Sequence, residues 1–247
     1  MSEKEILYLK EIIDKVVEDA FKRINYAYQH HREKEKNEDV GPGEGEIATR
    51  LIFPKYANNG IRISEQELRF AFVEAFNASQ DVEDANLFYS VETPTEKQYT
   101  GFTKGKPMAV KDSDMDGRSG EFDLVIFNDK HERVCLIEFK ANNAGKSEHE
   151  KDLLKLKEEG NGRLCYFIEV LRSYSGTNTI GSLKNKFRLN NEEGKTIIRC
   201  FALEGESRAK EQKGEDISKL FMRQFIRSGC DKDLIFMNLY EGGLKKT

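Results

Sequence analysis

Two apolar segments carry acidic and basic residues at a spacing that suits metal binding. The segments EFDLVIF (121–127) and RVCLIEFK (133–140) are joined by the short polar sequence NDKHE. Such a connection between two strand-like segments indicates a β-hairpin. Asp123 lies on its first strand, and Glu138 and Lys140 lie on its second. Charged groups in so apolar a setting are unfavourable unless they are paired or bind an ion.

Strand pairing across this hairpin predicts which side chains meet. If the turn is Lys130–His131, counting back along both strands places Asp123 opposite Glu138. Side chains alternate along a strand, so Lys140 shares a face with both carboxylates. This count requires a hairpin without a bulge, because an extra residue shifts the register. The apolar residues expected on the same face are Val125, Phe127, Val134 and Leu136.

Two facing carboxylates repel each other, and a divalent cation between them removes that repulsion. Oxygen ligands favour Mg²⁺ or Mn²⁺ over Zn²⁺. Lys140 beside such an ion could orient or deprotonate a water molecule, or stabilise charge that develops on a phosphate. The alternative is a simple ion pair between Glu138 and Lys140, since E-x-K is common by chance. The Asp on the paired strand favours the metal-binding interpretation.

The string GEFDLVIF–NDKHE–RVCLIEFK resembles the signature of the PD-(D/E)xK, or restriction-endonuclease-like, nuclease superfamily. Gly120, Asp123, Glu138 and Lys140 match its pattern of a Gly, an Asp three residues later, and E-x-K on the next strand. Phe122 stands where the motif has Pro, which many members also lack. The motif covers residues from about 118 to 141, and the order of elements extends the resemblance to about 64–171.

The resemblance implies that Asp123, Glu138 and the backbone carbonyl of Phe139 hold a Mg²⁺ ion, for which Mn²⁺ can substitute. It implies that Lys140 is the catalytic lysine. The family also includes inactive members. A catalytically silent module that binds nucleic acid or protein on the same fold is therefore the alternative function.

Members of this family often add an acid from the first core helix. Glu67 and Glu74 lie seven residues apart on one face of the helix expected there. Glu67 is preferred as a catalytic and metal-binding residue because it lies nearer the helix start. Its other role is the N3 position of a capping box on Ser64. Glu121 shares the face of Asp123 and is a weaker candidate.

Basic side chains near the motif are candidates for phosphate binding. One group precedes the motif in a long polar loop, and the other follows it on an expected helix. Contacts of this kind would make binding depend on salt concentration. Ordinary solvated charge is the alternative for both groups. The candidates are Lys104, Lys106, Arg118, Lys151 and Lys155.

The elements that would position these residues follow from hydrophobic periodicity. Helices are expected at 3–38, 64–78, 147–159 and 215–228, and strands at 86–93, 121–127, 133–140, 164–171, 197–204 and 234–240. Both hairpin strands are apolar on two faces, which indicates a sheet covered on both sides. We therefore expect an α/β fold with a restriction-endonuclease-like central mixed β-sheet flanked by helices, containing an αβββαβ core.

The first helix ends in a charged tail and the sequence GPGEG. We expect residues 1–45 to form an N-terminal helical arm and residues 46–247 to form the PD-(D/E)xK nuclease-like domain. The arm would pack on the core or on a second subunit, so a homodimer through this helix is one expectation. A purely structural subunit that dimerises in this way is a third hypothesis.

Composition limits the function further. The chain has 247 residues and a formal net charge of −4, so a contact with phosphates requires a local basic patch. The four cysteines form no C-x-x-C pattern and suggest free thiols in a reducing cytoplasm. No apolar segment approaches 18 residues and no signal peptide is apparent, so no membrane role is expected. We expect a divalent-metal-dependent nuclease, with DNA favoured over RNA as its substrate.

Overall fold

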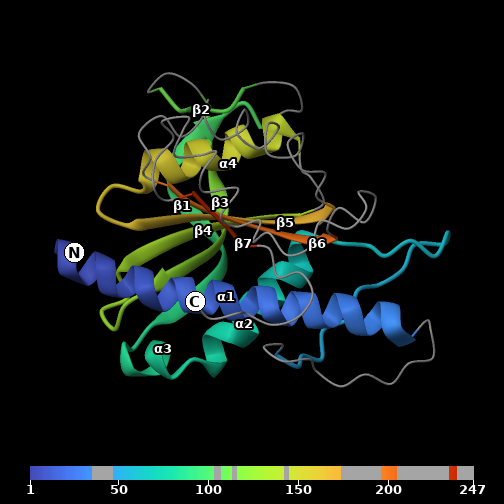
Figure 1. Ribbon diagram of the computed structural model, residues 1–247. Helices are drawn as coiled ribbons and strands as arrows, with labels where there is room; N and C mark the ends of the chain where they lie inside the picture. The colour runs from blue at the N-terminus through green and yellow to red at the C-terminus, as the bar shows by residue number, and fades with distance from the viewer. Residues whose placement is uncertain are drawn as a thin grey trace, which may run out of the picture.

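The computed structural model describes residues 1–34, 47–102, 107–112, 116–141, 145–173, 196–204 and 234–237. In this part of the chain, a seven-stranded sheet separates helices on its two faces (Figure 1). The strand order is β2-β1-β3-β4-β5-β6-β7. An α/β fold with a mixed sheet flanked by helices is thus confirmed.

The sheet has an antiparallel half and a parallel half. The strands β1 (Phe88–Thr100), β2 (Ala109–Val110), β3 (Arg118–Phe127) and β4 (Arg133–Ala141) pair antiparallel. The strands β5 (Leu164–Ser173), β6 (Thr196–Glu204) and β7 (Leu234–Met237) continue from β4 in parallel. β1 runs beyond its expected end and pairs with β2, which lies inside the expected loop. The helix expected at 215–228 lies outside the described residues.

One face of the sheet is covered by α1 (Glu3–Lys34) and α2 (Glu65–Ala78), with the short helix α3 (Gln80–Asp84) after them (Figure 1). The apolar stripe of α1 is buried against the sheet, and Phe21 stacks on Phe201 of β6 at 5.2 Å between ring centroids. The helix expected as an arm is therefore a layer of the same core as the sheet. No helix in the described residues is long and apolar enough to cross a membrane.

The other face is covered by α4 (Lys146–Glu159), which connects the parallel strands β4 and β5 (Figure 1). Leu153 and Leu156 of this helix pack with Val125, Leu136 and Phe167 from three neighbouring strands. The apolar layer on this face is the smaller of the two. Charged side chains of α4 consequently lie close to the sheet.

The β3–β4 hairpin differs from its expected form at the turn. Asn128 N donates to Glu132 O at 3.1 Å, so the turn is Asp129–His131 rather than Lys130–His131. The register then shifts between Ile126 and Phe127. The bulge turns Val134 to the α1 and α2 face, so the prediction for its face was wrong.

This bulge restores the register that the sequence predicted. Beyond it, Leu124 pairs with Ile137 as predicted, and the backbone pairing of β3 with β4 ends there. The predicted turn was one residue too short, and the bulge that the prediction excluded adds one residue. The two errors cancel for Leu124, Val125 and Ile126, and the pairing of Asp123 with Glu138, one step further, stays a prediction.

Candidate active site

Asp123 lies where β3 and β4 stop pairing through their backbones. Its Oδ2 accepts a hydrogen bond from the backbone N–H of Phe139 at 2.7 Å. The carboxylate thus accepts the hydrogen bond that a backbone carbonyl of the neighbouring strand would accept in a regular sheet, and this bond holds it between the two strands. Its other oxygen, Oδ1, accepts a hydrogen bond from Arg69 of α2 at 3.1 Å. Asp123 is half-buried here.

Arg69 joins Asp123 to a second carboxylate. Its Nη1 donates to Glu92 Oε1 at 3.1 Å. Glu92 stands beside Asp123 on β1, between residues that pair with Leu124 and Phe122, and its φ is 49°. A non-glycine residue in this left-handed region carries about 1–3 kcal/mol of strain. Strain of this kind is common at functional sites, and here it places a carboxylate beside the predicted motif.

Glu138 is buried on the α4 side of the sheet. It is 1% exposed, and its Oε1 lies 2.5 Å from Lys155 Nζ. The Lys155 ammonium group is the only polar partner of this oxygen among the described groups. Burial raises the pKa of Glu138 well above its ordinary value, and the charge on Asp152 adds to the effect against the opposing pull of Lys155. A nearby cation would therefore stabilise the ionised form.

Lys140 is held by two acids and a carbonyl. Its Nζ lies 2.7 Å from Asp152 Oδ2 and 3.3 Å from Glu65 Oε1. It also donates to Phe139 O at 3.2 Å. Burial alone would lower the pKa of Lys140, but the charges of Asp152 and Glu65 outweigh it and raise that pKa. Lys140 is thus an ammonium ion in this arrangement.

Asp152 of α4 joins the two lysines. Its Oδ1 lies 3.0 Å from Lys155 Nζ, and its Oδ2 binds Lys140. Burial would raise the pKa of Asp152, but Lys155 and Lys140 together hold it below its ordinary value. Burial would lower the pKa of Lys155, but Glu138 and Asp152 raise it. The sequence gives Asp152 no distinctive pattern beyond its i, i+3 spacing to Lys155.

Lys155 has a different environment from the one expected of a phosphate-binding lysine. It is 7% exposed, and it donates to Glu121 O at 2.7 Å in addition to its ion pairs. Its ammonium group is therefore part of the buried site rather than of a basic surface. Glu121 was a weaker candidate for a metal or water contact, and its backbone carbonyl accepts this hydrogen bond from Lys155.

The first-helix acid that meets the motif is Glu65, rather than Glu67 or Glu74. Glu67 binds Arg62 at 2.7 Å and accepts from Ser64, as its capping-box role predicts. Glu74 accepts from Thr49 at 2.6 Å. Glu65 faces Lys140, and burial, the largest cause, raises the pKa of its carboxyl. Glu65 lies one turn before Arg69, so one helix face supplies both groups.

The other basic candidates are not brought to this site. Arg118 is exposed at the start of β3, with its guanidinium 4.2 Å from the centroid of the Phe102 ring. Lys151 is half-buried on α4. Lys104 and Lys106 lie outside the described residues. The cations near the acids are instead Arg69, Lys140 and Lys155, and we call them, together with Glu65, Glu92, Asp123, Glu138 and Asp152, the charged cluster.

The donor set of the charged cluster suits a hard cation. Asp123, Glu138 and the carbonyl of Phe139 are oxygen donors, as Mg²⁺ requires. In the described residues, no three acidic, histidine or cysteine side chains are arranged to hold an ion. Arg69 and Lys155 instead lie against the carboxylates. Glu138 Oε1 already contacts the Lys155 ammonium group at 2.5 Å, so a metal ion at this oxygen would take the place of that cation.

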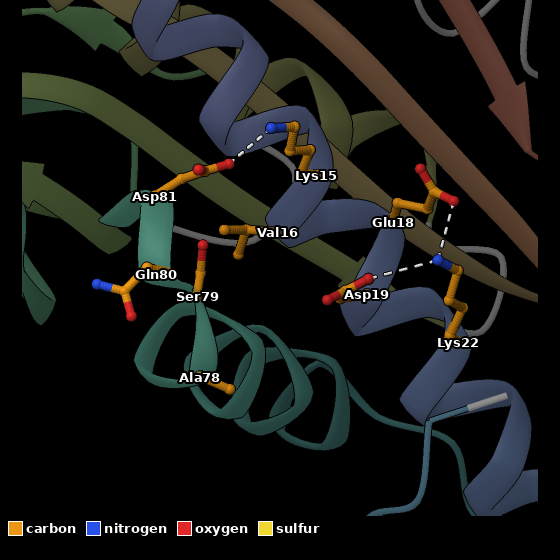
Figure 2. Close-up of a pocket in the computed structure, with 9 residues that line it drawn as sticks. All are labelled: Lys15, Val16, Glu18, Asp19, Lys22, Ala78, Ser79, Gln80 and Asp81. Carbon is orange, nitrogen blue, oxygen red and sulfur yellow. Dashed lines mark hydrogen bonds and ion pairs between the residues drawn. The ribbon is translucent and has the colours of Figure 1, made fainter. Parts of the chain in front are cut away.

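A hollow elsewhere in the molecule is unrelated to this cluster. It lies between α1 and the α2–α3 junction, and Figure 2 shows the residues that line it. Lys15 is 2.6 Å from Asp81 and Lys22 is 3.0 Å from Glu18 across this surface. These charges neutralise each other at the C-terminal end of α2. The charged cluster uses the opposite, N-terminal end.

Comparison with known proteins adds no relative. No family model matches the chain, and neither the curated proteins nor the solved structures include a match to it. The functional argument therefore depends on the geometry of the charged cluster and on the motif.

Proposed function

We propose that this protein is a divalent-metal-dependent nuclease that hydrolyses phosphodiester bonds, with DNA as the favoured substrate. The observation that carries the proposal is that Asp123 and Lys140 both bond to the backbone of Phe139, the residue that follows Glu138. Each residue of the motif is buried or half-buried and faces an ion-pair partner. Perturbed carboxyl and amine groups in one cluster are typical of a site for chemistry.

The order of elements also supports a restriction-endonuclease-like fold. The sequence α2, β1, β3, β4, α4, β5 follows the expected αβββαβ core, with β2 as an insertion. In this arrangement α2 brings Glu65 and Arg69 to the motif, and α4 brings Asp152 and Lys155. α1, β6 and β7 extend that core.

Asp123, Glu138 and the Phe139 carbonyl would hold Mg²⁺, or Mn²⁺ in its place, with Glu65 near them. When bound, the ion supplies Lewis-acid stabilisation of charge on the phosphate. Phe139 N–H fixes the Asp123 carboxylate for this role. Lys140, held as an ammonium ion by Asp152, stabilises negative charge on the phosphate oxygens and can donate a proton toward them. Arg69 is placed to add a second positive charge.

A catalytically silent binding module is the second candidate. The observation in its favour is that Arg69 and Lys155 already lie against the two carboxylates. A site that is neutralised by its own side chains would bind phosphates without turnover. The two candidates differ in whether cleavage of the bound strand requires metal.

A cleavage panel tests the proposal. Single- and double-stranded DNA and RNA are incubated with Mg²⁺, Mn²⁺ or EDTA, using wild type, Lys140→Ala and the control Lys157→Ala. The control removes an exposed lysine of α4. The proposal predicts cleavage that needs metal, survives in the control and disappears in Lys140→Ala. Binding without cleavage of any substrate would select the silent module.

We also propose a reducing, cytoplasmic setting. Cys135, Cys165 and Cys200 are buried and form no disulfide. Burial raises the pKa of the Cys165 thiol to about 12, which leaves it protonated and unreactive. A labelling experiment with a thiol reagent is expected to modify these three positions only after unfolding.

A further inference from the structure

A buried His–Glu pair lies beside the charged cluster and is not part of the motif. His149 Nε2 is 3.0 Å from Glu169 Oε2, and both side chains are fully buried. The ring also contacts Gly145 O through Nδ1 at 3.0 Å. It stacks on Phe167 of β5, with 5.0 Å between ring centroids. The pair therefore fixes the first turn of α4 on the sheet.

Hydrogen-bond chemistry sets the number of protons in this pair. A backbone carbonyl only accepts, so Nδ1 carries the proton that it donates to Gly145 O. The contact between Nε2 and Oε2 then needs one further proton, which lies on His149 or on Glu169. In either case the pair has no net charge. It can thus be buried without an external counter-ion.

His149 supplies the hydrogen bond that holds the Glu169 carboxyl. The other oxygen, Glu169 Oε1, has no hydrogen-bond partner among the described groups. Loss of the histidine would leave a buried carboxyl unpaired, which is strongly unfavourable. The orientation of Glu169 on β5 and the position of α4 are therefore set together.

The pair is linked to Lys140 from two directions. Glu169 is the β5 residue that pairs in register with Lys140 of β4. His149 lies three residues before Asp152, on the same face of α4. Asp152 in turn holds Lys140 Nζ at 2.7 Å. A movement of the first turn of α4 would carry Asp152 and the Lys140 ammonium with it.

We propose that His149 and Glu169 are positioning residues for Lys140 that act through Asp152. This inference rests on the proposed nuclease function, since it concerns the lysine of that site. Small displacements of a catalytic group, of about 1 Å, lower rates by about 100-fold. His149→Phe keeps a ring that can stack on Phe167 but removes both polar contacts. Glu169→Leu removes the partner on β5.

Glu169→Gln provides the conservative rescue. Its amide N–H₂ can donate to Nε2 of a neutral ring, whose Nδ1–H still donates to Gly145 O. Both contacts of His149 are thus kept while the carboxyl is removed. Tyr166→Phe is the matched structural control, because it removes a buried hydrogen bond to Asp14 under α1, on the other face of the sheet.

The experiment measures two properties of the full chain. The first is kcat and KM for cleavage with Mg²⁺. The second is the ¹³C resonance of Lys140 Cε in metal-free protein, assigned with Lys140→Arg. We expect His149→Phe and Glu169→Leu to lower kcat about 100-fold with little change in KM, and to shift the Lys140 resonance. We expect Glu169→Gln and Tyr166→Phe to leave both close to wild type.

The outcomes separate this inference from the proposed function. If wild type cleaves nothing, the proposed function fails, and a Lys140 shift confined to His149→Phe and Glu169→Leu still supports positioning. An unchanged Lys140 resonance in these variants overturns the inference, whatever the activity. If His149→Phe does not fold, Glu169→Gln decides: a Lys140 shift as large as in Glu169→Leu overturns the inference, and a wild-type resonance supports it.

Discussion

Two polar clusters against the same sheet, one under α1 and the other between α2 and α4, differ in their charge balance. Under α1, the carboxylate of Asp14 accepts from Arg199 at 2.8 Å and from Tyr166 at 2.9 Å, and also pairs with Lys10. This is one acid with several donors. Under α4 and α2, the charged cluster has more acids than cations, namely Glu65, Glu92, Asp123, Glu138 and Asp152 against Arg69, Lys140 and Lys155.

The difference separates a structural cluster from a candidate site. The donors around an acid offset the cost of its desolvation, and the loss of the acid removes one partner from each donor. In the charged cluster, burial raises the pKa of Glu138, and the charge on Asp152 adds to this effect while Lys155 opposes it. We infer that the α1 cluster attaches the helix to the sheet, and that the charged cluster gives up stability for function.

The largest predicted effect is on activity in the charged cluster. Asp123→Asn is expected to lower kcat by about 10⁴-fold, because it removes a negative metal ligand while its amide oxygen still accepts from Phe139 N–H. Steady-state cleavage assays measure this loss, with denaturant melts to confirm folding. Asp129→Asn, an exposed change at the tip of the same hairpin, is the control. Wild-type cleavage by Asp123→Asn would remove that residue from the site.

The α1 cluster is expected to show the reverse. Asp14→Asn removes the charge that pairs with the buried guanidinium of Arg199, so the free energy of unfolding should fall by about 1–3 kcal/mol. Cleavage per folded molecule should be unchanged. Urea unfolding combined with activity assays tests this. A lower kcat at full folding would show that the two faces are coupled.

Glu138→Gln is expected to change the free energy of unfolding in the opposite direction from Asp14→Asn. The change removes the ionised form that burial disfavours, so the free energy of unfolding should rise by roughly 0.5–2 kcal/mol while cleavage is lost. The sign is opposite to that expected for Asp14→Asn. Urea unfolding of both variants in one buffer measures it. A marked loss of stability in Glu138→Gln would mean that its ion pair with Lys155 is structural.

The pH dependence of stability is the smallest predicted effect. The folded-state pKa of Glu138 lies above the ordinary 4.5, so the folded state binds more protons than the unfolded state between these two values. By linkage, the contribution of Glu138 to stability decreases as pH rises through that window. Melts from acidic to neutral pH should therefore show a growing advantage for Glu138→Gln over wild type. A constant difference would contradict the raised pKa.

The sequence predicts what depends on local periodicity. The hairpin strands, both flanking helices and the register from Leu124 to Ile126 follow from alternation and spacing. The register was correct even though the turn was misplaced, because the bulge compensated. The sheet face on which Val134 lies was not predictable, because the bulge that turns it has no distinctive pattern in this sequence.

The partners of the motif depend on tertiary packing, and the sequence does not specify them. The place of Glu67 near the helix start favours it over Glu74, but Glu67 caps the helix at Ser64 and the acid that reaches Lys140 is Glu65. Lys155 was assigned to a surface, and the docking of α4 buries it against Glu138. Asp152 and the His149–Glu169 pair were missed for the same reason. Which face of a helix meets a sheet is decided by packing across the whole domain.

The most direct test of the account is a Mn²⁺ titration of wild type and Glu138→Gln. Mn²⁺ broadens NMR signals of nearby nuclei, so the backbone amide of Phe139 reports binding between β3 and β4. The account predicts that this signal broadens in wild type and persists at the same Mn²⁺ concentration in Glu138→Gln. An unaffected Phe139 signal in wild type, or equal broadening in both proteins, would contradict the assignment of the charged cluster as a cation site.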